Sequence, residues 1–360
     1  MSDATPRDEL DDLRARIGAL DANLIERAAL RIALARKVGE LKRSGNRATV
    51  DYAQERLVLE RARGLAAEHG LDPRAAEDLL AGLIRAAVTA QDEDSLRHGA
   101  AGAGQRAVVV GGAGRMGRWL ERFLSAQGFE TEILDPAASE AEQASAERAL
   151  PTAELVVCST PPRATAALYE SWRAAPPAGV VVDIASIKTP LLEPIRALQR
   201  AGGRVASIHP MFGPSVVLLR DADVVICDTG DAEATAAVER LFVSTTARVV
   251  RMPLEEHDRI MADLLSLAHA TAIAFALALP PEEHPVRSTT FSALEALAST
   301  VVRESPDVYY EIQTMNPYSI ESFERLRAAL EEVLSAVKDH DAKRFASLLH
   351  EGARRTRIRS

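Results

Sequence analysis

The spacing of the hydrophobic residues changes twice along this chain. Residues 8–91 carry apolar side chains at helical spacing, residues 106–252 alternate short β-branched runs with helical segments, and the helical spacing returns from 253 onward. The first apolar stripe consists of Leu10, Leu13, Ile17, Leu20 and Leu24. At 360 residues the chain is long enough for two or three domains. The pattern predicts an all-α region, an α/β region and a second all-α region.

The N-terminal region is predicted to form three helices. The first begins at Pro6, capped by Thr5, and runs to about Arg43, a length of roughly 50 Å at 1.5 Å per residue. The second covers 51–68, and the third begins at Pro73 and ends near Gln91. A helix as long as the first favours a partner along its length, another copy of the same chain.

Residues 92–105 lose the helical period and gain glycine and alanine, which predicts an interdomain linker. Beyond it, a doubly wound sheet of the Rossmann dinucleotide-binding type is predicted, with strands near 106–110, 130–134, 154–159, 179–184, 204–208, 222–227 and 247–250. The C-terminal region is predicted to be all-α, with helices at 255–279, 287–303, 307–314, 319–339 and 341–356. The expected domains are therefore 1–91, 106–252 and 253–360, joined by the linker 92–105.

A glycine-rich turn, GGAGRMG, follows the first predicted strand directly and opens a helix. We expect Gly112 to allow the tight turn, Gly114 to let the backbone approach a pyrophosphate, and Gly117 to let the helix pack close to the strand. Asp135 ends the second strand, where its carboxylate would accept hydrogen bonds from the ribose hydroxyls and repel a 2′-phosphate. The spacing predicts an NAD site, to which Arg115, Met116, Ser159 and Thr160 also contribute.

Composition narrows the class of protein. A net charge of −9 argues against non-specific nucleic-acid binding and gives no hint of an anionic membrane partner. Cys158 and Cys227 lie in apolar strand-like runs, which indicates reduced core thiols in a cytoplasmic protein. No run is apolar enough over a sufficient length to predict a membrane span, and no cluster of cysteine and histidine predicts a metal site.

Three cations of the first helix stand out. Arg31 and Lys42 are eleven residues apart and fall on nearly the same face, whereas Arg14 lies about 100° away. A pocket could combine Arg31 and Lys42 of one chain with Arg14 of its partner to bind a dianion. The alternative is a dimerisation hairpin with solvated charges.

The segments DELDDLRARIGALDANLIERAALRIALARKVGELK and VDYAQERLVLERAR resemble the all-helical, intertwined-dimer chorismate mutases over residues 8–91. The resemblance implies that Arg14 and Arg31 hold the two substrate carboxylates and that Lys42 and Gln91 flank the breaking ether oxygen. Asp51 and Glu55 would face the ring hydroxyl. A pericyclic rearrangement needs a compact conformer and positive charge at that oxygen, which such a cage supplies. Gln54 and Ala87 depart from the family pattern, which usually has arginine and a small polar residue.

A histidine, His209, lies at the carboxyl end of a predicted strand, where open α/β sheets bind ligands. From the residues alone, a catalytic histidine and one bound to a structural carbonyl remain equally open. His257 and Asp258 favour a polar first turn of a helix over a catalytic role, and a substrate-binding and a core role stay open for His269.

The motifs GGAGRMG, DIASIK, IHPMFGP and EEHDRIMADLLSLAHA together resemble prephenate dehydrogenase over residues 105–345. The order of the two parts is that of the bifunctional, T-protein type of tyrosine biosynthesis. The resemblance implies that His209 accepts the 4-hydroxyl proton, that Ser186 binds the same hydroxyl, and that His269 lies near the substrate. The family usually has an arginine for the ring carboxylate where this chain has Ser292, so Arg287 or Arg303 would have to replace it.

We therefore expect a cytoplasmic homodimer that converts chorismate to prephenate and then to 4-hydroxyphenylpyruvate with NAD, without nucleic-acid or membrane partners. One alternative keeps both reactions but uses the 4-amino-4-deoxy substrates, a possibility motivated by Gln54 and Ser292. Another treats the N-terminal helices as a non-catalytic dimerisation or effector-sensing module. A third makes the α/β half a generic hydroxyacid or imine reductase.

Overall fold

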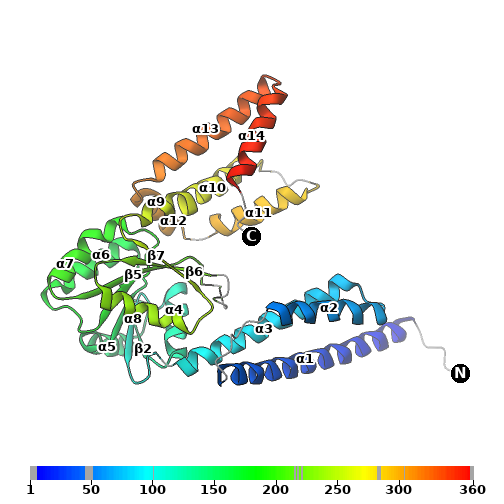
Figure 1. The fold of residues 1–360 in the computed structure, drawn as a ribbon, viewed down its shortest axis with the longest axis horizontal. Coiled ribbons are helices and arrows are strands. Elements are labelled where there is room, and N and C mark those ends of the chain that lie inside the picture. The colour runs from blue at the N-terminus through cyan, green and yellow to red at the C-terminus, as the bar shows by residue number, and fades with distance from the viewer. Residues whose placement is uncertain are drawn as a thin grey trace.

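The computed structural model describes residues 6–44, 52–99, 101–214, 216, 219, 222–281, 285–303 and 305–356. A central α/β part carries two helical parts, one formed by the N-terminal helices and one by the C-terminal helices (Figure 1). The predicted fold class, an all-α region on each side of a Rossmann-type domain, is confirmed.

The N-terminal part is a helical arm of α1 (Pro6–Ser44), α2 (Tyr52–Glu68) and α3 (Pro73–Gly99). In Figure 1 the long helix α1 runs beside α3, with α2 packed on the outer half of α3. Asp72 caps α3 by accepting the N–H groups of Arg74 and Ala75. The three predicted helices are present at nearly the predicted positions.

The end predicted for the third helix near Gln91 is wrong, because α3 continues to Gly99. Asp94, only 6% exposed, accepts two hydrogen bonds from the guanidinium of Arg36 on α1, at 2.8 and 2.5 Å. This fork ties the extra turns of α3 to α1 and stabilises helix where composition predicted a linker. Gly102 follows in a tight turn packed on Phe129, and its N–H donates to the carbonyl of Gln127.

The sheet has the order β2-β1-β3-β4-β5-β6-β7. Its strands are β1 (Arg106–Val110), β2 (Glu130–Leu134), β3 (Leu155–Cys158), β4 (Val180–Asp183), β5 (Arg204–Pro210), β6 (Asp223–Asp228) and β7 (Arg248–Pro253). All neighbours are parallel except β5 and β6, which pair antiparallel. Strand β5 extends two residues beyond its predicted end, so His209 lies within the strand and opposite Val225.

Helices cover both faces of the sheet, and alternate residues of each strand supply the two cores. On one face Ala107 and Val109 pack with α4 (Arg115–Ala126) and α8 (Ala232–Val243). On the other, Val108 and Val110 pack with α5 (Glu140–Ala149), α6 (Pro162–Ser171) and α7 (Leu192–Arg200). Short 3₁₀ turns η1 (Leu150–Thr152), η2 (Trp172–Ala174) and η3 (Thr189–Leu191) complete this part. Cys158 and Cys227 are buried free cysteines, as expected.

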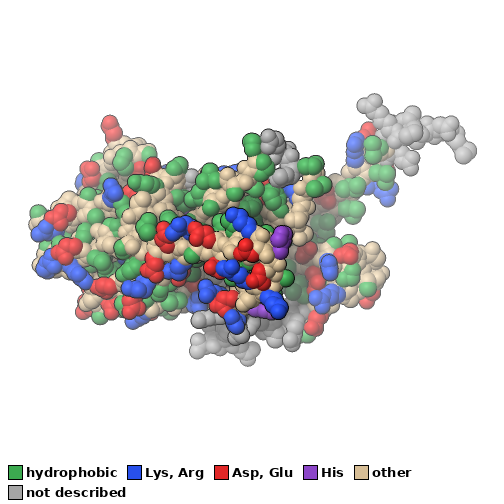
Figure 2. Space-filling model, turned by 90° about the horizontal axis from the view of Figure 1, so that it is seen from above, with side chains coloured by type: hydrophobic (Ala, Val, Ile, Leu, Met, Phe, Trp, Pro, Cys, Tyr) green, Lys and Arg blue, Asp and Glu red, His purple; other side chains and the backbone are tan. Residues whose placement is uncertain are grey.

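The C-terminal part begins with α9 (His257–Met261), the π-helical turn η4 (Ala262–Leu267) and α10 (Ala268–Ala278). Next come α11 (Thr289–Val302), α12 (Pro306–Met315), α13 (Ser319–Lys338) and α14 (Ala342–Arg355). By length and composition His257–Ala278 would pass for a membrane span, contrary to the prediction that no run is long and apolar enough. Its π-helical turn η4 packs against α13. Figure 2 shows acidic and basic side chains interspersed over the face drawn.

Candidate dehydrogenase and mutase sites

The glycine turn joins β1 to α4 and leaves no room for side chains at most of its glycines. Gly111 has a positive φ of 79°, so it is the left-handed residue of the turn, a role for which no residue was predicted. A Cβ on Gly112 would meet Ile133, and one on Gly117 would lie 2.3 Å from the carbonyl oxygen of Gly111. At Gly114 the nearest atom is 3.4 Å away, so this backbone has an open side. The turn is therefore closed toward the protein and open at Gly114, the N-cap of α4.

Asp135 lies beside this turn. Its Oδ2 accepts the N–H of Ala113 at 3.0 Å, and its Oδ1 accepts the N–H of Ala137 at 2.8 Å. A cavity at this edge of the sheet is lined by Gly111, Gly114, Asp135, Ser159 and Thr160, among others. Thr160 is held by Thr165, whose hydroxyl lies 2.8 Å from its own. Four predicted cofactor residues thus line one cavity, together with Gly111, the neighbour of the predicted Gly112.

A second cavity continues along the carboxyl ends of β3, β4 and β5. It is lined by Met116, Ser159, Thr160 and Ser186 together with side chains of α12. Its neighbour is lined by Met116, Ser186, His209 and His269 together with Thr300, Ser305 and Tyr309. The structure therefore brings Ser186, His209 and His269 together with the cofactor candidates Met116, Ser159 and Thr160. Arg115 is exposed on the first turn of α4 and lines none of these cavities.

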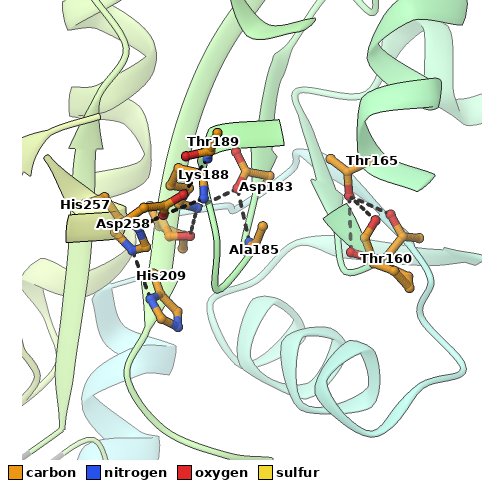
Figure 3. Close-up of polar contacts among 11 residues, drawn as sticks. Thr160, Thr165, Asp183, Ala185, Lys188, Thr189, His209, His257 and Asp258 are labelled. Atoms are coloured by element: carbon orange, nitrogen blue, oxygen red, sulfur yellow. Dashed lines mark hydrogen bonds and ion pairs between the residues drawn. The ribbon is translucent and has the colours of Figure 1, made fainter. Parts of the chain in front are cut away.

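His209 is 4% exposed and is not bound to a structural carbonyl in the contacts described. Its Nδ1 lies 3.0 Å from Nε2 of His257, and Nδ1 of His257 lies 2.7 Å from Oδ1 of Asp258 (Figure 3). Burial is the main cause that holds the pKa of His209 well below its ordinary value, followed by the nearby charges of His257 and Lys188. At neutral pH His209 is therefore an uncharged base.

His257 and Asp258 lie in the first turn of α9, as predicted, but they also make contacts that the sequence did not indicate. His257 is 0% and Asp258 2% exposed, and both belong to the chain of contacts behind His209. Spacing does not reveal this, because the two residues lie 48 and 49 positions beyond His209 and meet it only through packing of α9 on the sheet. The one usable signal is the position of two adjacent polar residues at the start of a strongly apolar helix.

Lys188, the last residue of the DIASIK motif, is another residue to which sequence reasoning gave no role. Its side chain is fully buried, and Nζ donates to Oδ1 of Asp183 at 2.6 Å and to the carbonyl of Ile208 at 2.7 Å. Its backbone N–H donates to Oδ1 of Asp258 at 2.8 Å. Lys188 thus contacts the residue preceding His209 and the carboxylate behind it.

Of the two remaining substrate candidates, only His269 lines a cavity. Its ring packs edge-on against Tyr309 at 4.5 Å, and its buried Nδ1 has no hydrogen-bond partner among the residues that the structure describes. Ser292 is exposed on the first turn of α11 and lies outside the cavity linings described. Arg287 pairs with Glu295 at 2.7 Å, and Arg303 caps the C-terminus of α11. Neither these arginines nor any other Lys or Arg lines the two cavities around Ser186 in the described part of the chain.

The mutase candidates lie in the helical arm. Arg14 is exposed on α1 and lies 3.3 Å from Asp11, whereas Arg31 is half-buried on the same helix. Gln91 on α3 is 8% exposed and donates to the carbonyl of Ala35 on α1. Asp51 and the side chains of Lys42, Gln54 and Glu55 lie outside the described residues. Ala87, the second departure from the family pattern, is buried in the arm.

Comparison with known families divides the chain in the same way. Residues 13–92 match the chorismate mutase type II family, and residues 129–251 match the nucleotide-binding domain of prephenate dehydrogenase. Residues 277–347 match the TYRAAT1-like C-terminal domain.

Individual relatives extend this picture. The T-protein of Enterobacter agglomerans is 28% identical over 94% of this chain and 90% of its own length. The 4-amino-4-deoxyprephenate dehydrogenase of Streptomyces pristinaespiralis is 30% identical over 68% of this chain and 89% of its own length. The crystal structure of prephenate dehydrogenase from A. aeolicus, in complex with hydroxyphenyl propionate and NAD+, has a TM-score of 0.56 at 18% identity and covers 70% of this chain and 96% of that chain. Its fold is that of the α/β and C-terminal parts described above. With a mutase family match, a dehydrogenase family match and a T-protein relative along nearly its full length, the chain belongs to the bifunctional chorismate mutase/prephenate dehydrogenase family.

Proposed function

We propose that this chain rearranges chorismate to prephenate in the helical arm and oxidatively decarboxylates prephenate to 4-hydroxyphenylpyruvate with NAD in the remainder. Both family matches occur on one chain in this order, and the T-protein similarity spans both. The 4-amino-4-deoxy series is not favoured, because the relative named for it matches only 68% of the chain. We keep 106–252 and 253–360 as proposed domains, and we extend the first domain, predicted as 1–91, to the end of α3 at Gly99.

The residues around the glycine turn fit NAD. The inside of the turn has no room for a side chain at Gly111, Gly112 or Gly117. The backbone at Gly114 is open, and a pyrophosphate can approach the N-terminus of α4 there. We assign Asp135 to the ribose hydroxyls, and Ser159, Thr160 and Met116 to the nicotinamide half. Bound NAD accepts a hydride. The charge of Asp135 disfavours the 2′-phosphate of NADP.

In the dehydrogenase reaction, we assign two tasks to the side chains of the protein: they accept the hydroxyl proton of prephenate, and they orient prephenate in the cavity. Uncharged His209 accepts the proton of the 4-hydroxyl of prephenate, and the Ser186 hydroxyl hydrogen-bonds the same oxygen. His269, with an unpartnered buried Nδ1 in the same cavity, is placed to bind a polar group of the substrate. Loss of the ring carboxylate as CO2 makes the ring aromatic and drives the reaction.

For the mutase, one chain is insufficient. Arg14 and Arg31 lie on the same continuous helix, and a rise of 1.5 Å per residue separates them by about 25 Å. One small dianion cannot bridge that distance, so we assign Arg14 to the site formed by Arg31, Lys42 and Gln91 of the partner. Asp51 and Glu55 complete the proposed site at the ring hydroxyl.

The arm also favours a homodimer on packing grounds. Its only core cluster in the described residues is Ala62, Ala66 and Ala76, against which Leu80 packs. Meanwhile Leu13, Ile17, Leu20, Leu24 and Leu34 of α1 are 46–63% exposed. An apolar stripe of this length beside so small a core is typical of a helix that is covered by a second copy. The buried free thiols of the α/β part suit the cytoplasm, where we place the enzyme.

The observation that carries the dehydrogenase assignment is that His209 and Ser186 share a cavity with Met116 of the glycine-turn helix. Purified protein given prephenate and NAD should release NADH and CO2 in equal amounts, and chorismate should give the same products through prephenate. His209→Asn should abolish both signals and leave the mutase rate intact. NADH formation without CO2 would instead identify a generic reductase-type enzyme.

A further inference from the structure

The hydrogen bonds of Asp258 determine which ring nitrogens of His257 and His209 carry a hydrogen. Its Oδ2 accepts the N–H of Thr189 at 2.7 Å, and its Oδ1 accepts the N–H of Lys188 at 2.8 Å. A carboxylate that accepts two backbone N–H groups is ionised and has acceptor positions only, so Nδ1 of His257 must be the donor to it. His257 in its neutral form then carries a lone pair on Nε2.

That lone pair determines the state of His209. Because Nε2 of His257 is an acceptor, Nδ1 of His209 must carry the hydrogen across the 3.0 Å contact. The second nitrogen of His209, Nε2, is then unprotonated. His209 lines the cavity with Ser186, so its free lone pair is available to a hydroxyl bound there.

Lys188 hydrogen-bonds the backbone next to His209 and also the carboxylate of Asp258, the first and last residues of this chain of contacts. Nζ of Lys188 binds the carbonyl of Ile208, which directly precedes His209, and Asp183 neutralises its charge. The backbone of the same residue binds Asp258. Asn316, the residue that follows α12, adds a hydrogen bond from Nδ2 to the carbonyl of Asp258 at 2.7 Å. The segment after β4, strand β5, helix α9 and the end of α12 therefore hold the two imidazoles.

We propose that Asp258 and His257 are positioning residues that impose the Nδ1–H tautomer on His209, with Lys188 as the buried anchor of the arrangement. The inference rests on the proposed dehydrogenase function. When Nε2 of His209 takes the 4-hydroxyl proton, its Nδ1–H···Nε2 bond to His257 spreads the new positive charge toward Asp258. The proton returns to the phenolate oxygen once CO2 has left, because the overall reaction releases no net proton.

The charges around the pair support this division of roles. Burial raises the pKa of the Asp258 carboxyl, but hydrogen bonds from His257, Thr189 and Lys188 outweigh it and hold that pKa below its ordinary value. Burial lowers the pKa of His257 and outweighs its hydrogen bond to Asp258. The charged groups that face the pair are Asp258, Lys188 and, behind Lys188, Asp183. The resting arrangement is thus an anion followed by two neutral rings.

Asp258→Asn tests the tautomer directly. An amide that turns its NH2 group toward His257 reverses both hydrogen bonds and places the hydrogen of His209 on Nε2, where it blocks proton acceptance. A reversal of this kind in a serine-protease triad lowers kcat by about 10⁴-fold. We expect the kcat on prephenate to fall by about 10²- to 10⁴-fold, with the KM for NAD and the mutase rate unchanged. His257→Gln keeps an acceptor for Nδ1 of His209 and should lose only about tenfold.

Asp263→Asn is the matched control, since Asp263 is an acidic residue of the next helical turn that pairs with Arg325 and not with the histidines. It should keep the wild-type kcat. A folded Asp258→Asn protein that shows His209 in the Nε2–H form and yet stays within threefold of the wild-type kcat would overturn the proposal. Wild-type protein that fails to oxidise prephenate would instead refute the proposed function and leave the tautomer question to spectroscopy.

The tautomers can be measured without turnover. Nitrogen-15 NMR of the histidine side chains in the full-length wild-type protein should show His257 and His209 in the Nδ1–H form, assigned by His257→Gln and His209→Asn. Asp258→Asn should convert the pair to the Nε2–H form. An Nε2–H signal for His209 in the wild type contradicts the proposal whatever the activity, also if Asp258→Asn does not fold.

Discussion

The backbone N–H of Ala113 donates to Oδ2 of Asp135 at 3.0 Å, which joins the middle of the glycine turn to the end of β2. Ala113 is the residue between Gly112 and Gly114, so the carboxylate and the open backbone lie on one side of the turn. A single dinucleotide can therefore meet both. This contact agrees with the NAD site that the spacing of the glycines and Asp135 predicted.

Asp135→Asn should weaken the binding of NAD and reduce the preference for NAD over NADP. Hydrogen bonds to a charged group contribute about 1.5–3 kcal/mol, so the KM for NAD should rise by roughly 10- to 100-fold. The KM for NADP should rise less or fall, because the repulsive charge is gone. Steady-state kinetics with both cofactors measure the ratio, and Glu130→Gln at the far end of the same strand is the control. An unchanged ratio would remove Asp135 from the cofactor site.

Gly117→Ala and Gly114→Ala should fail in different ways. A Cβ at Gly117 would lie 2.3 Å from the carbonyl oxygen of Gly111, so the turn must shift and thermal stability should fall along with NAD binding. At Gly114 the nearest atom is 3.4 Å away, so the fold should tolerate alanine while the methyl group obstructs the pyrophosphate. Calorimetry and NAD titration of both variants separate the two effects. Equal loss of stability in both would contradict this account.

Mixing two inactive mutase variants should restore activity. If the site takes Arg14 from the partner, a dimer of an Arg14→Ala chain and an Arg31→Ala chain has one intact and one doubly altered site. Random assembly of equal amounts should then recover about a quarter of the wild-type rate, since half of the dimers are mixed. The variants are combined by unfolding and refolding or by co-expression, and chorismate consumption is followed. Activity no greater than the sum of the parents would contradict a site shared between two chains.

Lys42→Ala should lower the mutase kcat by about 10²- to 10³-fold, because positive charge at the breaking ether oxygen is the main stabilisation available to this reaction. The dehydrogenase rate on supplied prephenate should not change. Lys37→Ala, an exposed lysine of the same helix, serves as the control. A helical arm without chemistry predicts no difference between the two variants in any residual mutase rate.

Dehydrogenase activity should persist to acidic pH. The proton-accepting form of His209 is neutral, and burial holds its pKa well below 6.5, so kcat/KM for prephenate should fall only below that value. Stability should decline in the same direction. As pH falls below about 6.5 the unfolded chain protonates this histidine and the folded chain does not, so protons favour unfolding. Rate profiles and thermal unfolding between pH 4 and 8 would check both, and an acid limb at or above 6.5 would be inconsistent with a neutral buried His209.

Local patterns were sufficient for much of the fold. The strands at 106–110 and 130–134 were predicted with their observed bounds because β-branched runs between glycine breaks have few alternative conformations. Prediction was poorer where a distant contact decides. The turns of α3 beyond Gln91 are tied to α1 by Arg36, 58 residues from its partner Asp94, and no local pattern contains that fork. The positive φ of Gly111 was not predicted, because two adjacent glycines are equally permissive and their spacing does not say which one turns.

The same division holds for the site. The order of motifs along the sequence determined the family, the NAD-type glycine turn with Asp135, and His209 as the candidate base, because each depends on residue type and short spacing. Only the tertiary structure placed His257 and Asp258 behind His209. It also showed that the buried Lys188 hydrogen-bonds both Asp258 and the carbonyl of Ile208, and that Ser292 lies outside the cavity linings described. These relationships depend on how α9, α11 and α12 pack against the carboxyl ends of the strands. Contacts between side chains far apart in the sequence depend on how the whole core packs, and they cannot be predicted from the spacing of residues along the chain.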